Sequence, residues 1–252
     1  MKKLLFLLPL FAIISCTNPD NPNKAKFNSN GCLECDNYGI GETFILDNHL
    51  YTVADSTILK TAIINNDDLT RFCTSQITSM KDLFNNKPLF NQNISSWDVS
   101  NVTDMRQMFV FADAFNQDIG NWDVSNVTDM YGMFGSADAF NQDISNWDVS
   151  SVANMSSMFS GPSSFNQDIS SWDVSNVSDM GGMFFESTSF NQDIGSWDVS
   201  NVLSMTIMFY KSALFNQDLT QWCVSNPSLS YYDFATESQL SPAYYPVWGT
   251  CP

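Results

Sequence analysis

The stretch "FNQDIGNWDVSNVTDMYGMF", residues 115–134, decides the fold because the chain repeats it. At an offset of 25, residues 140–159 are "FNQDISNWDVSSVANMSSMF". One tryptophan marks each copy: Trp97, Trp122, Trp147, Trp172, Trp197 and Trp222. A fixed period of about 20–29 residues is typical of a solenoid, in which each coil packs against its two neighbours.

The apolar residues of one period indicate the elements of a coil. Trp122 and Val124 are two residues apart, as on one side of a strand. Met130, Met133 and Phe134 have the spacing of one helix face. We therefore predict an α/β solenoid with one short parallel strand and one short helix in each coil, a cap at either end, and tryptophans buried in the core.

The spacing Ile119-x-x-Trp122-x-Val124-x-x-Val127 resembles the strand segment of leucine-rich repeats. The fuller string "FNQDIxxWDVSNVTDMxxMF" resembles the repeat of the BspA-like surface-protein family. It departs from ordinary leucine-rich repeats in having Trp, Met and Val where leucine is usual. The resemblance covers about residues 77–222. It implies a leucine-rich-repeat-like fold in a bacterial surface lipoprotein associated with adhesion and binding.

The first residues resemble a lipoprotein signal. Lys2 and Lys3 precede an apolar run of 11 residues, which is too short to span a bilayer and suits a signal-peptide core. The sequence Ile-Ile-Ser before Cys16 resembles the bacterial lipobox. An ordinary secretory signal with a chance cysteine is the alternative. We expect lipid on Cys16 to anchor the protein in the cell envelope, at the outer membrane or the cell surface.

The period also sets the expected domain boundaries. A hairpin around Asp47 and Asn48 and a helix from Ser56 are expected ahead of the repeats. The predicted order is a lipoprotein signal peptide, a tether, an N-terminal cap, a six-coil repeat and an irregular C-terminal cap: residues 1–15, 16–30, 31–71, 72–224 and 225–252.

The charge excludes one class of partner. The chain has 27 acidic and 10 basic residues, for a net charge of −17. Between Trp97 and Trp222 the basic residues are Arg106 and Lys211. Binding to nucleic acid needs clustered lysines and arginines, so we expect no nucleic-acid partner.

One aspartate follows each of the first five repeat tryptophans, and together they form a predicted row on the exposed strand face: Asp98, Asp123, Asp148, Asp173 and Asp198. We predict that this row is the ligand or cation face. Carboxylates about 4.8 Å apart repel by about 0.9 kcal/mol even in water, and such crowding raises their pKa values. Either the hydrogen bonds of turns and ladders or bound calcium would offset the repulsion. No other cofactor is expected.

Six cysteines occur, and export to an oxidising compartment favours disulfides. Cys73 and Cys223 lie six coils apart, too far to pair with each other. We expect Cys223 to pair with Cys251, and Cys73 with Cys32 or Cys35. The Cys32-x-x-Cys35 spacing alone gives little support for a zinc site.

These observations favour a non-catalytic scaffold that binds or adheres to an extracellular protein or glycan and is tied to the membrane by lipid. An enzyme acting on polysaccharides is one alternative, but a catalytic carboxylate pair needs two unlike environments, whereas every coil carries the same aspartate. A purely structural envelope protein is the other alternative.

Overall fold

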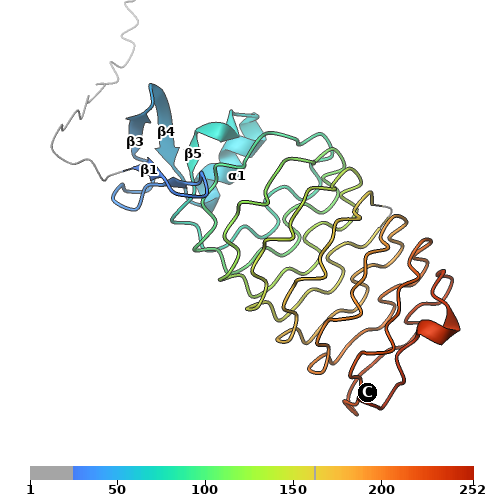
Figure 1. The fold of residues 1–252 in the computed structure, drawn as a ribbon. Helices are drawn as coiled ribbons and strands as arrows, with labels where there is room; N and C mark the ends of the chain where they lie inside the picture. The colour runs from blue at the N-terminus through green and yellow to red at the C-terminus, as the bar shows by residue number, and fades with distance from the viewer. Residues whose placement is uncertain (1–24, 162) are drawn as a thin grey trace, which may run out of the picture.

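The computed structural model describes residues 25–161 and 163–252. A small N-terminal cap leads into a regular stack of coils, which ends in a turn-rich segment (Figure 1). The predicted signal peptide, Cys16 and most of the tether lie outside the described residues. In the described part, no helix is long and apolar enough to cross a lipid bilayer.

Two small sheets and one helix form the N-terminal cap. One sheet pairs β1 with β2, and the other has the order β3-β4-β5, antiparallel and then parallel. The elements are β1 (Lys26–Phe27), β2 (Leu33–Glu34), β3 (Thr43–Leu46), β4 (His49–Val53), α1 (Ser56–Asn65), the 3-10 helix η1 (Leu69–Arg71) and β5 (Phe72–Cys73). Because β1 lies inside the predicted tether, the cap begins earlier than the sequence indicated.

The cap contains the hairpin and the helix expected from the sequence. Asp47 and Asn48 join β3 to β4 with φ of 50° and 62°, the left-handed conformation of a tight hairpin turn. Helix α1 begins after Asp55, whose carboxylate accepts hydrogen bonds from the backbone N–H groups of Thr57 and Ile58 at 2.9 and 2.8 Å. These bonds satisfy two of the unpaired donors of the first turn.

Successive coils are joined by a segment that we call the ribbon. One residue per ribbon forms a parallel bridge to a neighbouring coil: Ser79, Asp104, Asp129, Asn154, Asp179, Ser204 and Ser230. Each ribbon comprises this residue and the seven that follow, for example residues 104–111. The N–H groups of Met105 and Gln107 donate to the carbonyls of Asp129 and Tyr131 in the next coil, at 3.0 and 2.8 Å.

The ribbon takes the place of the short helix predicted for each coil. The N–H of Met108 closes a turn onto the carbonyl of Met105 at 3.2 Å, so N–H groups that close turns alternate with N–H groups that bond to the next coil. Gln107 and Phe111 have φ of 54° and 55°, which a right-handed helix does not contain. The helix-like spacing of the methionines therefore arises from successive turns.

The strand predicted at Trp122 and Val124 is not formed either, although both side chains point inward as expected. They are 3% and 1% exposed. The indole N–H of Trp147 donates to the carbonyl of Ile119 in the preceding coil at 3.1 Å. All six repeat tryptophans make the equivalent bond. The prediction that they are buried is confirmed.

Phenylalanines and methionines fill the rest of the core. The rings of Phe109 and Phe134 in neighbouring coils are 5.5 Å apart between centroids, and those of Phe115 and Phe140 are 5.9 Å apart. Within one coil, Phe109 and Phe115 stack at 4.0 Å. Close stacking of rings supplies much of the apolar contact between coils.

The Phe-Asn-Gln triplet of each repeat builds a ladder of side-chain amides. The Oδ1 atom of Asn116 accepts hydrogen bonds from the backbone N–H of Asn141 at 3.0 Å and from Gln142 Nε2 at 2.8 Å. We call the equivalent residues the asparagine ladder: Asn91, Asn116, Asn141, Asn166, Asn191 and Asn216. Its last member accepts from the N–H of Ser241.

The repeat continues into the segment predicted as the C-terminal cap. Ser230 bridges to Ser204, so a seventh ribbon lies beyond residue 224. The rest of this coil includes the 3-10 helix η2 (Pro242–Tyr244) and Trp248, whose ring stacks on Tyr231 at 4.0 Å. The six-coil boundary inferred from the tryptophans is thus one ribbon short.

Candidate binding surface

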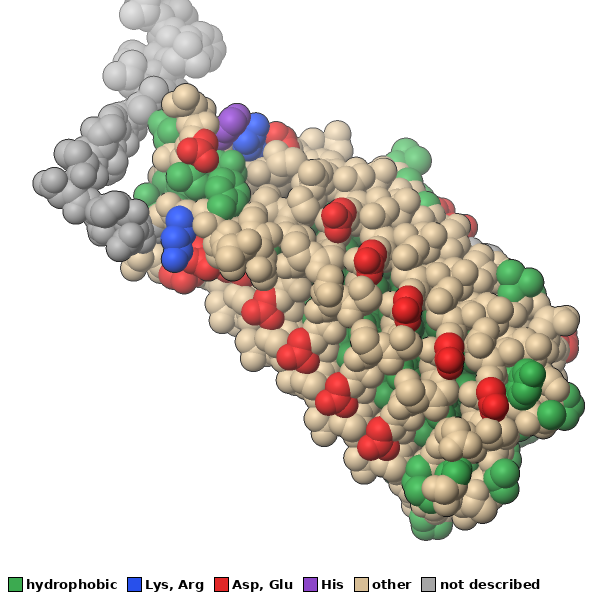
Figure 2. Space-filling view, viewed as in Figure 1, with side chains coloured by type: hydrophobic (Ala, Val, Ile, Leu, Met, Phe, Trp, Pro, Cys, Tyr) green, Lys and Arg blue, Asp and Glu red, His purple; other side chains and the backbone are tan. Residues whose placement is uncertain are grey.

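Two rows of carboxylates run along the stack, and Figure 2 shows acidic side chains aligned in rows on the face in view. The first, which we call the tryptophan row, follows the tryptophans: Asp123, Asp148, Asp173 and Asp198. The second, which we call the isoleucine row, precedes the isoleucine or leucine of each coil: Asp118, Asp143, Asp168, Asp193 and Asp218. All nine residues are exposed.

Both rows sit at turns, where each carboxylate accepts a hydrogen bond from the backbone two residues further on. Asp118 accepts from the N–H of Gly120 at 3.0 Å, and Asp123 accepts from that of Ser125 at 3.1 Å. This geometry is an Asx-turn, which asparagine forms equally well. Asn93, at the head of the isoleucine row, makes the same bond to Ser95 at 3.0 Å. The turns therefore need the oxygen but not the charge.

Asp98 does not lie on the exposed face, where the sequence predicted it. It is only 5% exposed, because the N-terminal cap packs over the first coil. Its carboxylate still closes a turn with the N–H of Ser100, and its backbone carbonyl accepts from Thr74 Oγ1 at 2.8 Å. The sequence period located Asp98 correctly within the coil but contained no information about what covers it.

The pKa values of five row carboxylates are lowered, contrary to the expectation that crowding raises them: Asp143, Asp168, Asp173, Asp198 and Asp218. Hydrogen bonds from the side chain and backbone of Ser175 hold the pKa of Asp173 below its ordinary value. Ser200 does the same to Asp198, and the opposing repulsion from Asp173 is a lesser effect. The turn hydrogen bonds thus outweigh the repulsion between neighbouring carboxylates.

A third set of carboxylates lies on the ribbon. Asp104 and Asp129 close turns onto residues 106 and 131. The guanidinium of Arg106 bonds to Asp104 at 2.7 Å and lies 3.7 Å from Asp129. Its hydrogen bond lowers the pKa of Asp104. This set is partly neutralised, unlike the two exposed rows.

Among the described residues, no group of three or more His, Cys, Asp or Glu side chains is arranged to hold a metal ion. The rows place one carboxylate per coil at each corner, whereas calcium takes six to eight oxygen ligands. Calcium on the tryptophan row therefore stays a prediction that would need ligands from solvent or a partner.

The cysteines close the caps. Cys35 pairs with Cys73, which settles the choice left open between Cys32 and Cys35, and Cys223 pairs with Cys251 as expected. Cys32 is a free, buried thiol. Burial, followed by the charges of Asp98, Asp123 and Glu34, raises its pKa to about 11. It is therefore protonated at neutral pH and a poor nucleophile.

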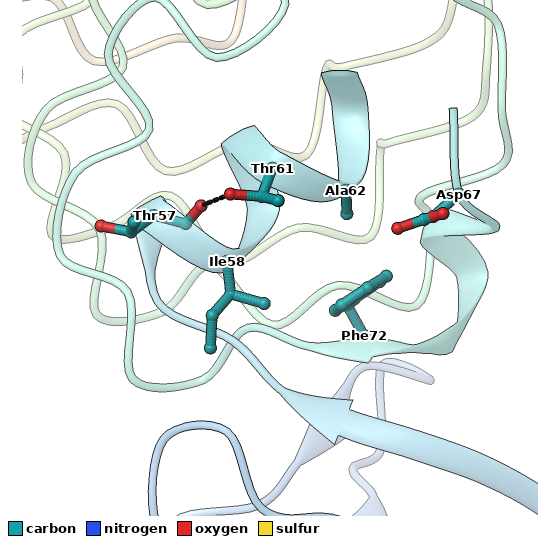
Figure 3. Close-up of a pocket in the computed structure, with 6 residues that line it drawn as sticks. All are labelled: Thr57, Ile58, Thr61, Ala62, Asp67 and Phe72. Carbon is teal, nitrogen blue, oxygen red and sulfur yellow. Dashed lines mark hydrogen bonds between the residues drawn. The ribbon is translucent and has the colours of Figure 1, made fainter. Parts of the chain in front are cut away.

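The described part of the chain has cavities beside α1 and beside the tryptophan row. One of about 240 Å³ lies beside α1, and Figure 3 shows its lining: Thr57, Ile58, Thr61, Ala62, Asp67 and Phe72. The hydroxyl of Thr61 donates to the carbonyl of Thr57 at 2.9 Å. Asp67 is the one charged residue in this largely apolar lining. The other, of about 350 Å³, opens beside Asp123 and Asp148 and is lined by amides and tryptophan-row carboxylates.

Comparison with known proteins identifies a family but no function. A family model described as "Mycoplasma protein of unknown function, DUF285" matches residues 54–162 and 141–245, and so covers the coils and the C-terminal segment. No curated protein matches the chain. No solved structure matches it either.

Proposed function

The chain belongs to the DUF285 family, and we propose that it is a lipid-anchored, non-catalytic binding scaffold on a bacterial cell surface. The family description names no activity, so the proposal depends on the residues themselves. The lipobox-like sequence at Cys16 supports the anchor. The resemblance of the repeat to BspA-like surface proteins supports adhesion to an extracellular protein or glycan.

The observation that carries the proposal is the pair of exposed acidic rows. Neither row forms an ion pair with a described lysine or arginine. Their carboxylates are fixed by turn hydrogen bonds, so they meet a ligand already oriented, which lowers the entropic cost of binding. A repeated row of negative charge is complementary to a ligand with repeated positive charge. We therefore expect a basic protein segment or a glycan that carries amino groups.

The geometry gives less support to catalysis. Every coil offers the same carboxylate in the same turn, while an acid–base pair needs one raised and one ordinary pKa at a single place. Asp143, Asp168, Asp173, Asp198 and Asp218 all have pKa values shifted downward. Each is thus ionised at neutral pH and unsuited to donating a proton.

The test compares two charge-matched variants of residues 25–252. Asp148→Asn with Asp173→Asn removes two charges from the tryptophan row while keeping both turns. Asp113→Asn with Asp138→Asn removes two exposed charges that precede the asparagine ladder in their coils. Binding to a panel of extracellular proteins and glycans is measured at low and high salt, with and without a calcium chelator.

The first variant should lose affinity and salt dependence, and the second should not. Equal binding by both variants would contradict a role for the row. If the chelator abolished binding by the unmodified chain, the result would instead favour calcium ions that bridge the carboxylates and the ligand. Release of reducing ends or unsaturated sugars from any glycan would replace the scaffold with an enzyme.

A further inference from the structure

The hydrogen bonds between ribbons have a direction. In the fifth ribbon the N–H groups of Met180, Gly182, Phe184 and Glu186 donate to the carbonyls of the sixth, at 2.8 to 2.9 Å. The sixth ribbon donates in turn from Met205, Ile207, Phe209 and Lys211 to the seventh, at 2.7 to 2.9 Å. Each ribbon thus presents donors toward the C-terminal end of the stack and acceptors toward the N-terminal end.

The seventh ribbon has the same donors, but no described coil follows it. Its equivalent N–H groups belong to Tyr231, Asp233, Ala235 and Glu237, and none of them donates to an acceptor in the described residues. Asp233 and Glu237 have φ of 49° and 60°, matching 51° and 55° at Ile207 and Lys211. The last ribbon therefore keeps the conformation that pairs with another coil.

The remainder of the last coil covers the core but not this edge. Trp248 packs on Tyr231 and Phe234, and the carbonyl of Tyr244 accepts from the N–H of Leu219. Tyr231 and Glu237 stay exposed, Asp233 is half-buried, and Tyr232 beside them is 73% exposed, whereas Ala235 is 5% exposed. A partner could therefore reach the ribbon edge from solvent at Tyr231, Asp233 and Glu237.

The opposite end of the stack is closed. Ser56, at the start of α1, donates through its hydroxyl to the carbonyl of Ser79 at 2.9 Å, and Leu83 in the first ribbon is buried. A second copy of the chain cannot supply its first ribbon without displacing α1. Two C-terminal edges cannot pair with each other, because both present donors.

We infer that the edge formed by Tyr231, Asp233 and Glu237 docks an extended, basic segment of a partner protein, which takes the position of a further coil. Alternate carbonyls of that segment accept the free N–H groups, as in the addition of a strand to a sheet edge. Asp233 and Glu237 provide charge complementarity, because residues 225–252 contain no lysine or arginine. Glu237 also accepts from the hydroxyl of Tyr210 at 3.2 Å and lies near Lys211 of the sixth ribbon. This surface is separate from the acidic rows.

The probe is a synthetic peptide of residues 201–212, which carries the sixth ribbon and Lys211. Amide hydrogen exchange of residues 25–252 is followed by NMR with and without the peptide. The amides of Tyr231, Asp233 and Glu237 should exchange quickly in the free chain and slow markedly when the peptide binds. Slow exchange in the free chain, or no added protection at a saturating peptide concentration, would overturn the inference.

Variants separate this edge from the rows. Asp233→Asn with Glu237→Gln should weaken peptide binding by up to about fivefold, as expected when the one cation of the peptide, Lys211, loses an exposed ion pair. Asp148→Asn with Asp173→Asn should leave it unchanged. The reverse pattern would place the peptide on the rows and refute the edge. Concentration-dependent dimerisation of the chain, abolished by the edge variant, would assign the edge to a second copy and also refute the partner segment.

Discussion

The asparagine ladder gives the sharpest test of how the coils hold together. Asn141 lies in the middle of the stack, and its Oδ1 atom accepts from the backbone N–H of Asn166 at 3.0 Å and from Gln167 Nε2 at 2.9 Å. Asn141→Ala removes this acceptor and leaves the N–H of Asn166 without one, while Gln167 Nε2 keeps its 3.0 Å bond to the backbone carbonyl of Asn141. Asn141→Asp keeps an oxygen in the same place and should keep both bonds.

Loss of the bond to Asn166 leaves its N–H unsatisfied and the contact of Gln167 is weakened, so Asn141→Ala should lower the free energy of unfolding by about 1.5 kcal/mol. For a chain of this size that corresponds to a Tm about 3–6 °C lower. Asn141→Asp should cost less than about 1 kcal/mol. Thermal unfolding of residues 25–252, followed by circular dichroism, measures both changes.

Asn146→Ala is the matched control. Asn146 is exposed and makes no hydrogen bond within the described residues, so its replacement should change stability by less than about 0.5 kcal/mol. If Asn141→Ala were as mild as this control, the ladder would contribute little to stability. If Asn141→Asp were as harmful as Asn141→Ala, the accepted bonds would not be the cause.

Three further predictions concern charge and sulfur. The pKa values of Asp173 and Asp198 are lowered in the folded chain, so their ionised forms stabilise the fold above about pH 4. The Tm should therefore fall as the pH drops below that value. A rise in Tm would instead support the view that repulsion between neighbouring carboxylates raises their pKa values. Cys32 should resist a thiol reagent in the folded chain at pH 8 and react fully in denaturant, since it is buried with a raised pKa; rapid labelling of the folded chain would contradict its burial. Cys223→Ser with Cys251→Ser should lower stability by about 3 kcal/mol and expose the last coil to protease first; intact resistance there would show that the disulfide does not secure this end.

The sequence predicted the period, the burial of the tryptophans and the cap hairpin, because each depends on local chemistry repeated many times. It did not predict the ribbon. Methionines at i and i+3 occur in a helix, but they occur equally in two successive turns when every fourth residue adopts positive φ. Gly132 and Gly182 stand at such positions, and they were the available signal for turns. The serines and threonines at other outward-facing positions of this segment are compatible with either a helix or successive turns.

Neither the burial of Asp98 nor the open C-terminal edge could be predicted from periodicity. Both features lie at an end of the described stack, where one side of a coil does not face another coil. The cap covers Asp98, and the backbone N–H groups of Tyr231 and its neighbours have no acceptor among the described residues. A period describes what each coil shares with the others, so it carries no information about the two coils that differ in their surroundings.

The charge of the rows is the one repeated feature that folding does not require. Asn93 and Asn154 close their turns with neutral amides at 3.0 Å, in the same geometry as the aspartates around them. Asparagine at every such position would build the same coils without repulsion between neighbours. Solubility alone would be served by charge scattered over any exposed position. Carboxylates aligned along one strip, coil after coil, instead concentrate negative potential where a long cationic ligand could follow the stack, and this alignment is why we assign the strip to binding.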